Sequence, residues 1–550
     1  MKAGSVRILG IFVLAAGTLM GMSSIGYGQP YEPEHIWHRC GEENEDYFGY
    51  YMAGIGDVNG DTCDDFIIYE RYPVTRAVLF YGGNPPDTIP DLLIHNPYPY
   101  GYFGRHIENI GDANHDGSDD IAINGGYEQE DIQRVFIYLG GGDFDTIPDV
   151  VLSEATFWDG FGSKIEGIGD VNGDGYDDVA VHASNYPFPQ GNGKVWIYFG
   201  GSPMDSDADW SQEGSGQHVA YGNSISGKGS LNGDGYDDFA IYENTGYPSP
   251  DDTRYYIYYG GDQLDTIPDV IIHGTEYYPE IDLSSSSALI QNLNGDSFAD
   301  LVIDAAMTSN AIVLWGGNPM NTTIDVILRG FDPNPLERNM NLAFAGDVNR
   351  DGYGDIIASQ PAAYGGNGII LAYLGCPWMD GYPDMFWDCW QTQWAACGTT
   401  LTNIGDMNGD GVDDIVFGSL SEAVRGSVDI WAGDSLFVVN VPEDQSPAIP
   451  QSFRLLPPYP NPFNSSITIP FEITPGLAGD LSLRIFNVLG QEVLDLSLAA
   501  RNLVSSGTAT HHEVVWNGRD FTGADCGSGI YLVELRTGTQ KQTEKIVLLK

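Results

Sequence analysis

A nine-residue acidic loop recurs seven times along the chain, with oxygen-bearing side chains at alternating positions. In the copy Asp170–Asp178 (DVNGDGYDD), aspartate or asparagine stands at positions 1, 3, 5 and 9, and Gly175 stands at position 6. Calcium takes several oxygen ligands at once, and a tight loop of this kind brings them to one point. The copies begin at residues 57, 112, 170, 230, 292, 347 and 406, which is the regular spacing of a repeat architecture.

The elements that must hold these loops are β-strands, because a short apolar run rich in β-branched residues follows each loop. An EF-hand would instead need a helix here and a glutamate at position 12 of the loop. That position is apolar in every copy: Ile68, Ile123, Val181, Ile241, Ile303, Ala358 and Phe417. The EF-hand interpretation therefore fails, and each loop joins two strands.

Each repeat, 55 to 62 residues long, carries signals for four antiparallel strands, as a propeller blade does. The first strand opens in five copies with a glycine eight residues before the loop, as in Phe161-Gly162. The third strand ends in glycine, and the fourth is marked by an aspartate. The seventh repeat has no fourth-strand signal, but Glu34–Arg39 near the N-terminus supplies one. Pairing the two closes the ring and leaves no open edge, which predicts seven blades.

These features resemble the FG-GAP repeats of the integrin alpha N-terminal propeller over about residues 30–437. The resemblance implies up to seven Ca²⁺ ions, with side-chain ligands at positions 1, 3, 5 and 9 and a backbone carbonyl at position 7. The residues so implied are Asp57, Asn59, Asp61, Cys63, Asp65, Asp112, Asn114, Asp116, Ser118, Asp120, Asp170, Asn172, Asp174, Tyr176, Asp178, Ser230, Asn232, Asp234, Tyr236, Asp238, Asn292, Asn294, Asp296, Phe298, Asp300, Asp347, Asn349, Asp351, Tyr353, Asp355, Asp406, Asn408, Asp410, Val412 and Asp414. Ser230 and Asn292 replace aspartate at position 1, so we expect weaker sites in the fourth and fifth loops.

A second domain follows the repeats. Residues 438–452 are rich in proline and predict a linker. Residues 453–550 contain further alternating runs, and segments such as Pro458–Asn464 and Lys545–Lys550 resemble the Ig-like sorting domains of type IX secretion substrates, which are related to the Ig-like domain of flagellar hook-capping proteins. The resemblance implies the type IX secretion machinery as a partner; a passive β-sandwich stalk is the alternative. The predicted fold class is all-β, a seven-bladed β-propeller (29–437) followed by a small Ig-like β-sandwich.

The N-terminal segment and the net charge of the chain indicate where the protein is located and which partners are excluded. Residues 1–28 have the basic start, apolar run and small residues of a cleaved secretory signal, and no other segment is long and apolar enough to span a membrane. The chain has 23 Lys+Arg against 77 Asp+Glu, a net charge of −54, which argues against nucleic acid and anionic membranes as partners. A secreted or cell-surface protein is therefore expected.

No catalytic motif stands out. The chain has no Gly-x-Ser-x-Gly elbow and no His-Glu-x-x-His, and its 10 histidines are scattered. We therefore expect an adhesion or ligand-binding module for an extracellular glycan or protein. A secreted polysaccharide-degrading enzyme and a structural surface-layer component are the alternatives, because a fold does not fix a function.

The loops opposite the acidic ones are rich in aromatic residues. Tyr98, Tyr100, Trp158 and Tyr186 are expected there as exposed contacts for a ligand, although turn formation alone explains the Tyr-Pro pairs equally well.

An exported protein with six cysteines can form disulfides. Cys389 and Cys397 are the expected pair. Cys40 and Cys63 are expected at opposite ends of their strands and not to pair, and Cys526 has no partner in its domain.

Overall fold

The computed structural model divides into two compact units, Met1–Asn440 and Val441–Lys550. The structure describes residues 34–41, 47–71, 75–98, 101–127, 132–142, 144–153, 157–189, 191–214, 220–244, 253–274, 288–305, 310–320, 322–330, 340–361, 368–377, 379–388, 396–419, 426–434, 453–455, 463, 466–473, 481–487, 492–497, 511–519, 526–527, 529–537 and 540–548. The predicted signal (1–28) and linker (438–452) lie outside these ranges. Within them, no helix has the length and apolar character needed to cross a membrane.

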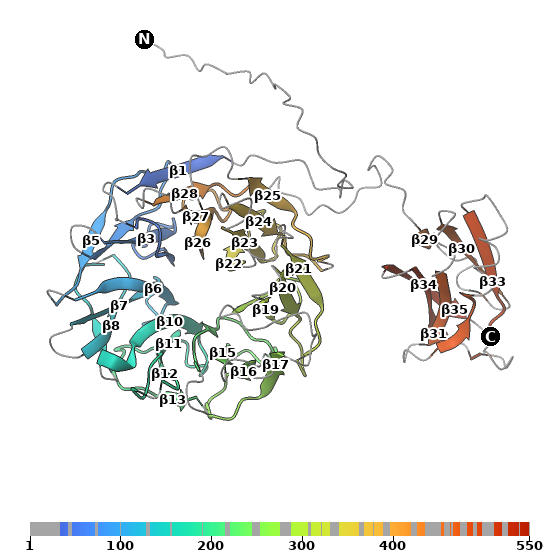
Figure 1. The fold of residues 1–550 in the computed structure, drawn as a ribbon, viewed down its shortest axis with the longest axis horizontal. Coiled ribbons are helices and arrows are strands. Elements are labelled where there is room, and N and C mark those ends of the chain that lie inside the picture. Colours follow the sequence, from blue (N-terminus) through green and yellow to red (C-terminus); the bar gives the residue numbers. More distant parts are fainter. Residues whose placement is uncertain are drawn as a thin grey trace, which may run out of the picture. The chain divides into compact units, whose positions relative to one another are not determined.

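The described part of the first unit forms seven four-stranded antiparallel sheets, which stand around a ring in Figure 1. We number the sheets 1 to 7 in chain order. They are β2 (Met52–Gly56), β3 (Asp65–Glu70), β4 (Arg76–Phe80) and β5 (Leu92–His95); β6 (Phe103–Gly111), β7 (Asp120–Tyr127), β8 (Ile132–Tyr138) and β9 (Val150–Leu152); β10 (Phe161–Gly169), β11 (Asp178–Ala183), β12 (Lys194–Tyr198) and β13 (Trp210–Glu213); β14 (Ile225–Ser226), β15 (Phe239–Asn244), β16 (Thr253–Tyr258) and β17 (Val270–His273); β18 (Ala288–Gln291), β19 (Asp300–Ala305), β20 (Asn310–Leu314) and β21 (Val326–Arg329); β22 (Asn341–Gly346), β23 (Asp355–Gln360), β24 (Ile369–Tyr373) and β25 (Met385–Asp388); and β26 (Cys397–Asn403), β27 (Ile415–Ser419) and β28 (Ser427–Trp431) with β1 (His35–Cys40).

The seventh sheet joins the two ends of the repeat region. Its strand order is β1-β28-β27-β26, so the N-terminal strand is its outermost member. Trp37 of β1 is buried, and its indole Nε1 donates a hydrogen bond of 2.6 Å to the carbonyl of Asp87, in the loop between β4 and β5 of sheet 1. The predicted closure is therefore present, and the all-β fold class is confirmed.

The core of the ring lies between neighbouring sheets, where apolar side chains from facing strands pack together. Between sheets 2 and 3, for example, Val135 and Ile137 pack with Phe161, Val179 and residues around them. The aromatic–glycine signal is explained here: Phe161 is buried, and Gly162 adopts φ +78°, a left-handed conformation that favours glycine. The strand runs from this pair to the acidic loop that follows it.

The second unit has two sheets around its own core. One consists of β29 (Phe453–Leu455), β30 (Ile467–Ile473) and β33 (His511–Trp516). The other has the order β32 (Glu492–Asp495), β31 (Leu481–Asn487), β34 (Gly529–Thr537) and β35 (Gln540–Leu548). Trp516 is fully buried among the apolar side chains of both sheets, as in a β-sandwich. The short strands β29 and β32 were not predicted.

Candidate metal centres

Five of the seven acidic loops are organised by an aspartate at position 1, which accepts hydrogen bonds from the backbone of its own loop. In sheet 3, Asp170 Oδ1 accepts from the N–H groups of Gly173 and Asp174 at 2.7 and 3.0 Å, and Oδ2 accepts from Gly175 at 2.9 Å. Asp174, at position 5, accepts from Tyr176 N–H at position 7. These contacts fold the loop so that its acidic side chains gather on one side.

The aspartate at position 9 fastens each loop to its own sheet. Asp178 is fully buried; its Oδ2 accepts from Val171 N–H at 3.0 Å, and its Oδ1 accepts from Gly200 N–H, after the third strand, at 2.9 Å. The same two contacts recur in all seven loops, at Asp65, Asp120, Asp178, Asp238, Asp300, Asp355 and Asp414. Both oxygens therefore have a structural role besides any ligand role.

Burial is the main cause of a high pKa at position 9, and the backbone hydrogen bonds only partly oppose it. The pKa is raised to about 8 at Asp65, Asp178 and Asp355, and to about 7 at Asp120, Asp238, Asp300 and Asp414. Neighbouring loop aspartates raise it further, for example Asp174 and Asp170 beside Asp178. A divalent cation would relieve this repulsion.

The donor set of the loops fits calcium, which prefers carboxylate and amide oxygens. In the second loop, Asn114 Oδ1, at position 3, is buried with no hydrogen-bond partner among the described residues, as expected of an oxygen meant for a cation. The fourth loop fits less well, because Ser230 supplies a hydroxyl instead of a carboxylate at position 1. Its Oγ lies 3.4 Å from Asn232 Oδ1 and 3.5 Å from Asp234 Oδ1, which are long distances for hydrogen bonds. In the fifth, Asn292 keeps the fold of the loop without a charge, accepting from Gly295 N–H at 2.7 Å.

Sequence reasoning overlooked the aspartate at position 8, which connects neighbouring sheets. Asp177 Oδ2, in the third loop, accepts from Asp112 N–H of the second loop at 2.9 Å. Gly111, just before that loop, has φ +79°, and a Cβ there would lie 2.0 Å from Asp177 Oδ2. The absence of a side chain on the glycine before one loop thus leaves room for the position-8 carboxylate of the next loop.

This glycine–aspartate pairing occurs at five of the seven junctions between sheets: Gly405 with Asp64, Gly56 with Asp119, Gly111 with Asp177, Gly169 with Asp237, and Gly346 with Asp413. The other two junctions have Gly229 opposite Ala299 and Gln291 opposite Gly354. The recurring glycine and aspartate were visible in the sequence, but their partners come from different repeats.

The central channel has a mixed charge. It is a cavity of about 610 Å³ lined by the first strands of the sheets. Lys164 Nζ lies 2.8 Å from Glu166 Oε2, and Lys228 Nζ donates to the carbonyl of Asn109 at 2.9 Å. Burial, and then the charge of Glu166, raise the pKa of Glu108 to about 7.

The face opposite the acidic loops carries exposed aromatic rings, but not all of those predicted. Trp158 is 57% exposed and Phe188 is 55% exposed, with ring centroids 5.9 Å apart. Asp159 holds the two segments together, because its carbonyl accepts from Asn185 N–H at 2.7 Å and its Oδ1 accepts from Phe188 N–H at 2.8 Å. This fixes the pair of rings on a rigid support.

Two of the four aromatics that were expected to be exposed are only partly exposed. Tyr98 is partly buried under Arg134, whose guanidinium carbon lies 4.3 Å from its ring centroid. Tyr186 packs edge-on against Trp196 at 5.3 Å. Tyr98 therefore packs on the next sheet, sheet 2, and Tyr186 on its own sheet, and burying apolar area stabilises both positions. Tyr100 lies outside the described residues.

Of the predicted disulfide, Cys397 is disulfide-bonded and Cys389 lies outside the described residues. Cys40 and Cys63 each carry a thiol, so they do not pair with each other.

Two segments match known families. Residues 165–198 match the FG-GAP repeat. Residues 458–549 match the secretion system C-terminal sorting domain. The sorting-domain match indicates that the chain is exported, as a secreted or cell-surface protein.

The repeat region is similar to integrin alpha chains. Integrin alpha-5 of Xenopus laevis is 31% identical over 219 residues, which cover 36% of this chain and 20% of the integrin. Integrin alpha-IIb of Mus musculus is 33% identical over 184 residues, which cover 30% and 17%. The chain thus spans about a fifth of the length of these relatives. The solved structure of PorZ, a surface component of the type IX secretion system of Porphyromonas gingivalis, aligns at 10% identity over 88% of this chain and 74% of PorZ, with a TM-score of 0.18.

Proposed function

We propose that this protein is a calcium-binding adhesion or ligand-binding module displayed at the bacterial cell surface. The exposed Trp158–Phe188 pair carries the proposal. Large aromatic rings held on a rigid support offer contact area at little cost in conformational entropy, as binding surfaces do.

A second group of aromatic side chains lies on the same face, at the start of sheet 1. Tyr50 and Tyr51 pack edge-on at 4.6 Å, and Tyr47 contacts Tyr50 at 6.1 Å. The guanidinium of the exposed Arg71 stands 5.2 Å from the Tyr47 ring. Tyrosine with arginine is the composition of a binding surface for a glycan or a protein.

Calcium, in this proposal, acts through stability rather than by touching the ligand. The acidic loops lie at the other ends of the first strands, away from Trp158 and Phe188. None has a glutamate at position 12, so affinity should be modest, on the order of 10⁻⁴–10⁻³ M as in extracellular modules. The fourth and fifth loops would bind calcium most weakly, because Ser230 and Asn292 at position 1 lack a carboxylate.

The test of binding is a glycan and cell-surface screen of the full chain with two double variants. Trp158→Ala with Phe188→Ala should lose binding and keep its melting temperature, because both rings are exposed. Ile89→Ala with Ile147→Ala is the matched control, since these side chains are 69% exposed on loops between third and fourth strands. Undiminished binding by the Trp158/Phe188 variant would contradict the proposal.

The role of the second unit has its own test. Its last strand, β35, pairs with β34 along its whole length, from Gln540 opposite Thr537 to Leu548 opposite Gly529. Deleting residues 545–550 removes buried Ile546 and Leu548 from the sandwich core and should trap a folded propeller in the periplasm. Fusing residues 453–550 to a neutral reporter should export the reporter. Equal surface labelling with and without the tail would favour a passive stalk.

A hydrolase is the second candidate, favoured by the channel. A glutamate with a pKa near 7 beside a second glutamate and a lysine is an arrangement that can act as a general acid. Release of reducing ends from the glycan panel, lost in Glu108→Gln, would support it; binding without release supports the adhesion module.

A further inference from the structure

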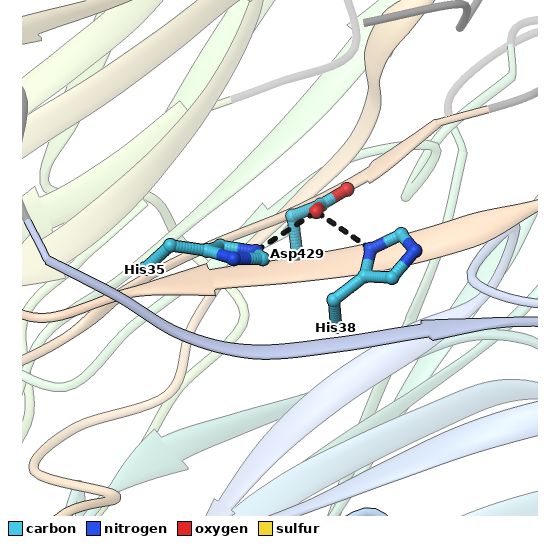
Figure 2. A group of neighbouring side chains, drawn as sticks. All are labelled: His35, His38 and Asp429. Atoms are coloured by element: carbon cyan, nitrogen blue, oxygen red, sulfur yellow. Dashed lines mark hydrogen bonds and ion pairs between the residues drawn. The ribbon is translucent and has the colours of Figure 1, made fainter. Parts of the chain in front are cut away.

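We infer that a transition-metal ion, of the kind that prefers imidazole, binds where the ring closes, to His35, His38 and Asp429. Figure 2 shows the three side chains converging between β1 and β28. His35 Nε2 and His38 Nδ1 lie 3.0 and 2.8 Å from the same Asp429 Oδ1. One ligand atom from each residue lies within 4.8 Å of the others.

A β-bulge brings the two histidines to one side of β1. Side chains of a regular strand alternate, so residues three apart would point to opposite faces. Here the register shifts between His35 and Trp37: His35 pairs with Trp431, Trp37 with Ile430, and His38 with Asp429. The extra residue puts His35 and His38 on the same face as Asp429, while Trp37 turns into the core.

The spacing of the donors suits a small four-coordinate ion. Zinc bonds nitrogen and carboxylate oxygen at about 2.0–2.2 Å, so donors at the corners of a tetrahedron stand about 3.3–3.5 Å apart. The observed 3.0 and 2.8 Å are shorter by a few tenths of an ångström, a shift that side-chain rotation supplies. Asp429 is nearly buried, with 13% of its side chain exposed, whereas the histidines are about a third exposed. An ion can therefore enter from the histidine side.

Neighbouring residues orient the two rings as second contacts of a metal site do. With Nδ1 of His38 turned toward Asp429, its Nε2 lies 3.3 Å from the sulfur of Cys40. The His35 ring lies against Trp431, with centroids 4.8 Å apart. The site therefore has defined ring positions before any ion arrives.

The chemistry of the site separates it from the acidic loops. Calcium takes oxygen ligands, whereas two imidazoles and one carboxylate suit zinc, and three protein ligands leave a fourth position open to water or to a partner's side chain. Such an ion would join the N-terminal strand to the last sheet at a point where their backbone pairing is interrupted by the bulge.

The test uses the full-length protein without an affinity tag, saturated with calcium so that the acidic loops are occupied. Cobalt(II) reports its coordination by its visible absorption, and zinc displaces it. We expect one cobalt per chain with a four-coordinate spectrum, at least a tenfold loss of affinity in His38→Ala and Asp429→Asn, and no change in His95→Ala, a histidine exposed on β5. Zinc should raise the melting temperature of the unaltered protein and of His95→Ala, but not that of Asp429→Asn.

Three results would overturn the inference. The first is a folded, calcium-loaded protein that gives no four-coordinate cobalt spectrum. The second is an equal spectrum in Asp429→Asn, which is nearly the same size as the native side chain and should fold. The third is a sulfur-to-cobalt band that Cys40→Ser removes, which would replace the assigned ligand set. A spectrum kept in Cys40→Ser supports it.

Discussion

The junctions between the sheets are of two kinds, and the difference concerns charge. At five junctions a left-handed glycine before one loop meets the position-8 aspartate of the next, as Gly111 meets Asp177. At the two junctions that follow sheets 4 and 5, the partners are Gly229 with Ala299 and Gln291 with Gly354. The backbone link survives there: Ala299 N–H donates to the carbonyl of Ser230 at 2.8 Å.

The same two junctions also lack an aspartate at position 1, where Ser230 and Asn292 stand. At each junction, the position-1 aspartate of one loop and the position-8 aspartate of the next loop are therefore either both present or both absent. An extra carboxylate beside a loop is tolerable where a cation offsets it and costs stability where none binds. On the proposal that the loops bind calcium, this difference predicts that five junctions favour a bound cation and that two hold together without one.

Removing calcium should have the largest effect. Each occupied loop adds about 1.4 kcal/mol when free calcium is tenfold above its dissociation constant, so five loops together contribute several kcal/mol. Thermal unfolding with calcium and with EDTA measures this. Asp170→Ala should reduce the calcium-dependent rise in melting temperature, and Ser230→Ala should not. Equal losses in the two variants would remove the distinction between the junctions.

The pH dependence in EDTA comes next, because it involves all seven position-9 aspartates. Their pKa values are about 7 to 8 in the folded protein, against about 3.9 when unfolded. The folded state therefore holds more protons, and stability falls as pH rises through about 7 to 8. The melting temperature should be higher at about pH 6.5 than at about pH 8, and calcium should shrink the difference.

The pH range of that experiment, about 6.5 to 8, is chosen so that titration of the buried histidines contributes little to the change in stability. Burial lowers the pKa of His106 to about 4 and of His182 to about 3, so both oppose the carboxylates once pH falls below their unfolded value of about 6.5. A melting temperature that rises toward pH 8 in EDTA would contradict the assignment of the position-9 pKa values.

A single added methyl group at a paired glycine should cost about 3 kcal/mol. Gly111→Ala combines left-handed strain of about 1–3 kcal/mol with displacement of Asp177 from Asp112 N–H. Gly117→Ala is the matched control, with φ +94° but nothing within 4 Å of the new atom, and should cost about 1 kcal/mol. Chemical denaturation distinguishes them; equal costs would mean that the carboxylate contact adds nothing.

The smallest effect is a loss at a junction that lacks both aspartates. Ala299→Asp places a carboxylate opposite Gly229, beside the loop whose position 1 is Ser230, and should cost about 0.5 kcal/mol because that loop binds a cation too weakly to offset the charge. The reverse change, Asp177→Ala, should cost about 1 kcal/mol, because Asp112 N–H loses its acceptor. Chemical denaturation in calcium measures both; a gain in stability from Ala299→Asp would contradict the distinction between the two kinds of junction.

The sequence predicts most of the first unit because its signals are local and repeated. The loop at Asp170–Asp178 and the fourth strand supplied by Glu34–Arg39 can both be inferred from patterns within a repeat or from a gap in one. Position 8 could not be interpreted this way, since Asp177 acts on Asp112, 65 residues away. The bulge in β1 also left no signal, because its register is set by pairing with β28.

The aromatic face shows a second limit. A Tyr-Pro pair predicts a turn but not the direction of the ring, and Tyr186 turned back toward Trp196 while Trp158 remained exposed. Which occurs depends on the space above each sheet, and packing between elements decides that.

The pairing of β1 with β28 makes closure of the ring depend on synthesis of the whole ring. His35–Cys40, the first described strand, pairs with Ser427–Trp431, the last strand of the ring, so it has no pairing partner until more than half of the chain has been synthesised. The residues that match the sorting domain follow directly afterwards. A chain truncated inside the ring would lack both the pairing partner of its first strand and the sorting domain. Such incomplete chains would have an open ring and would not be exported.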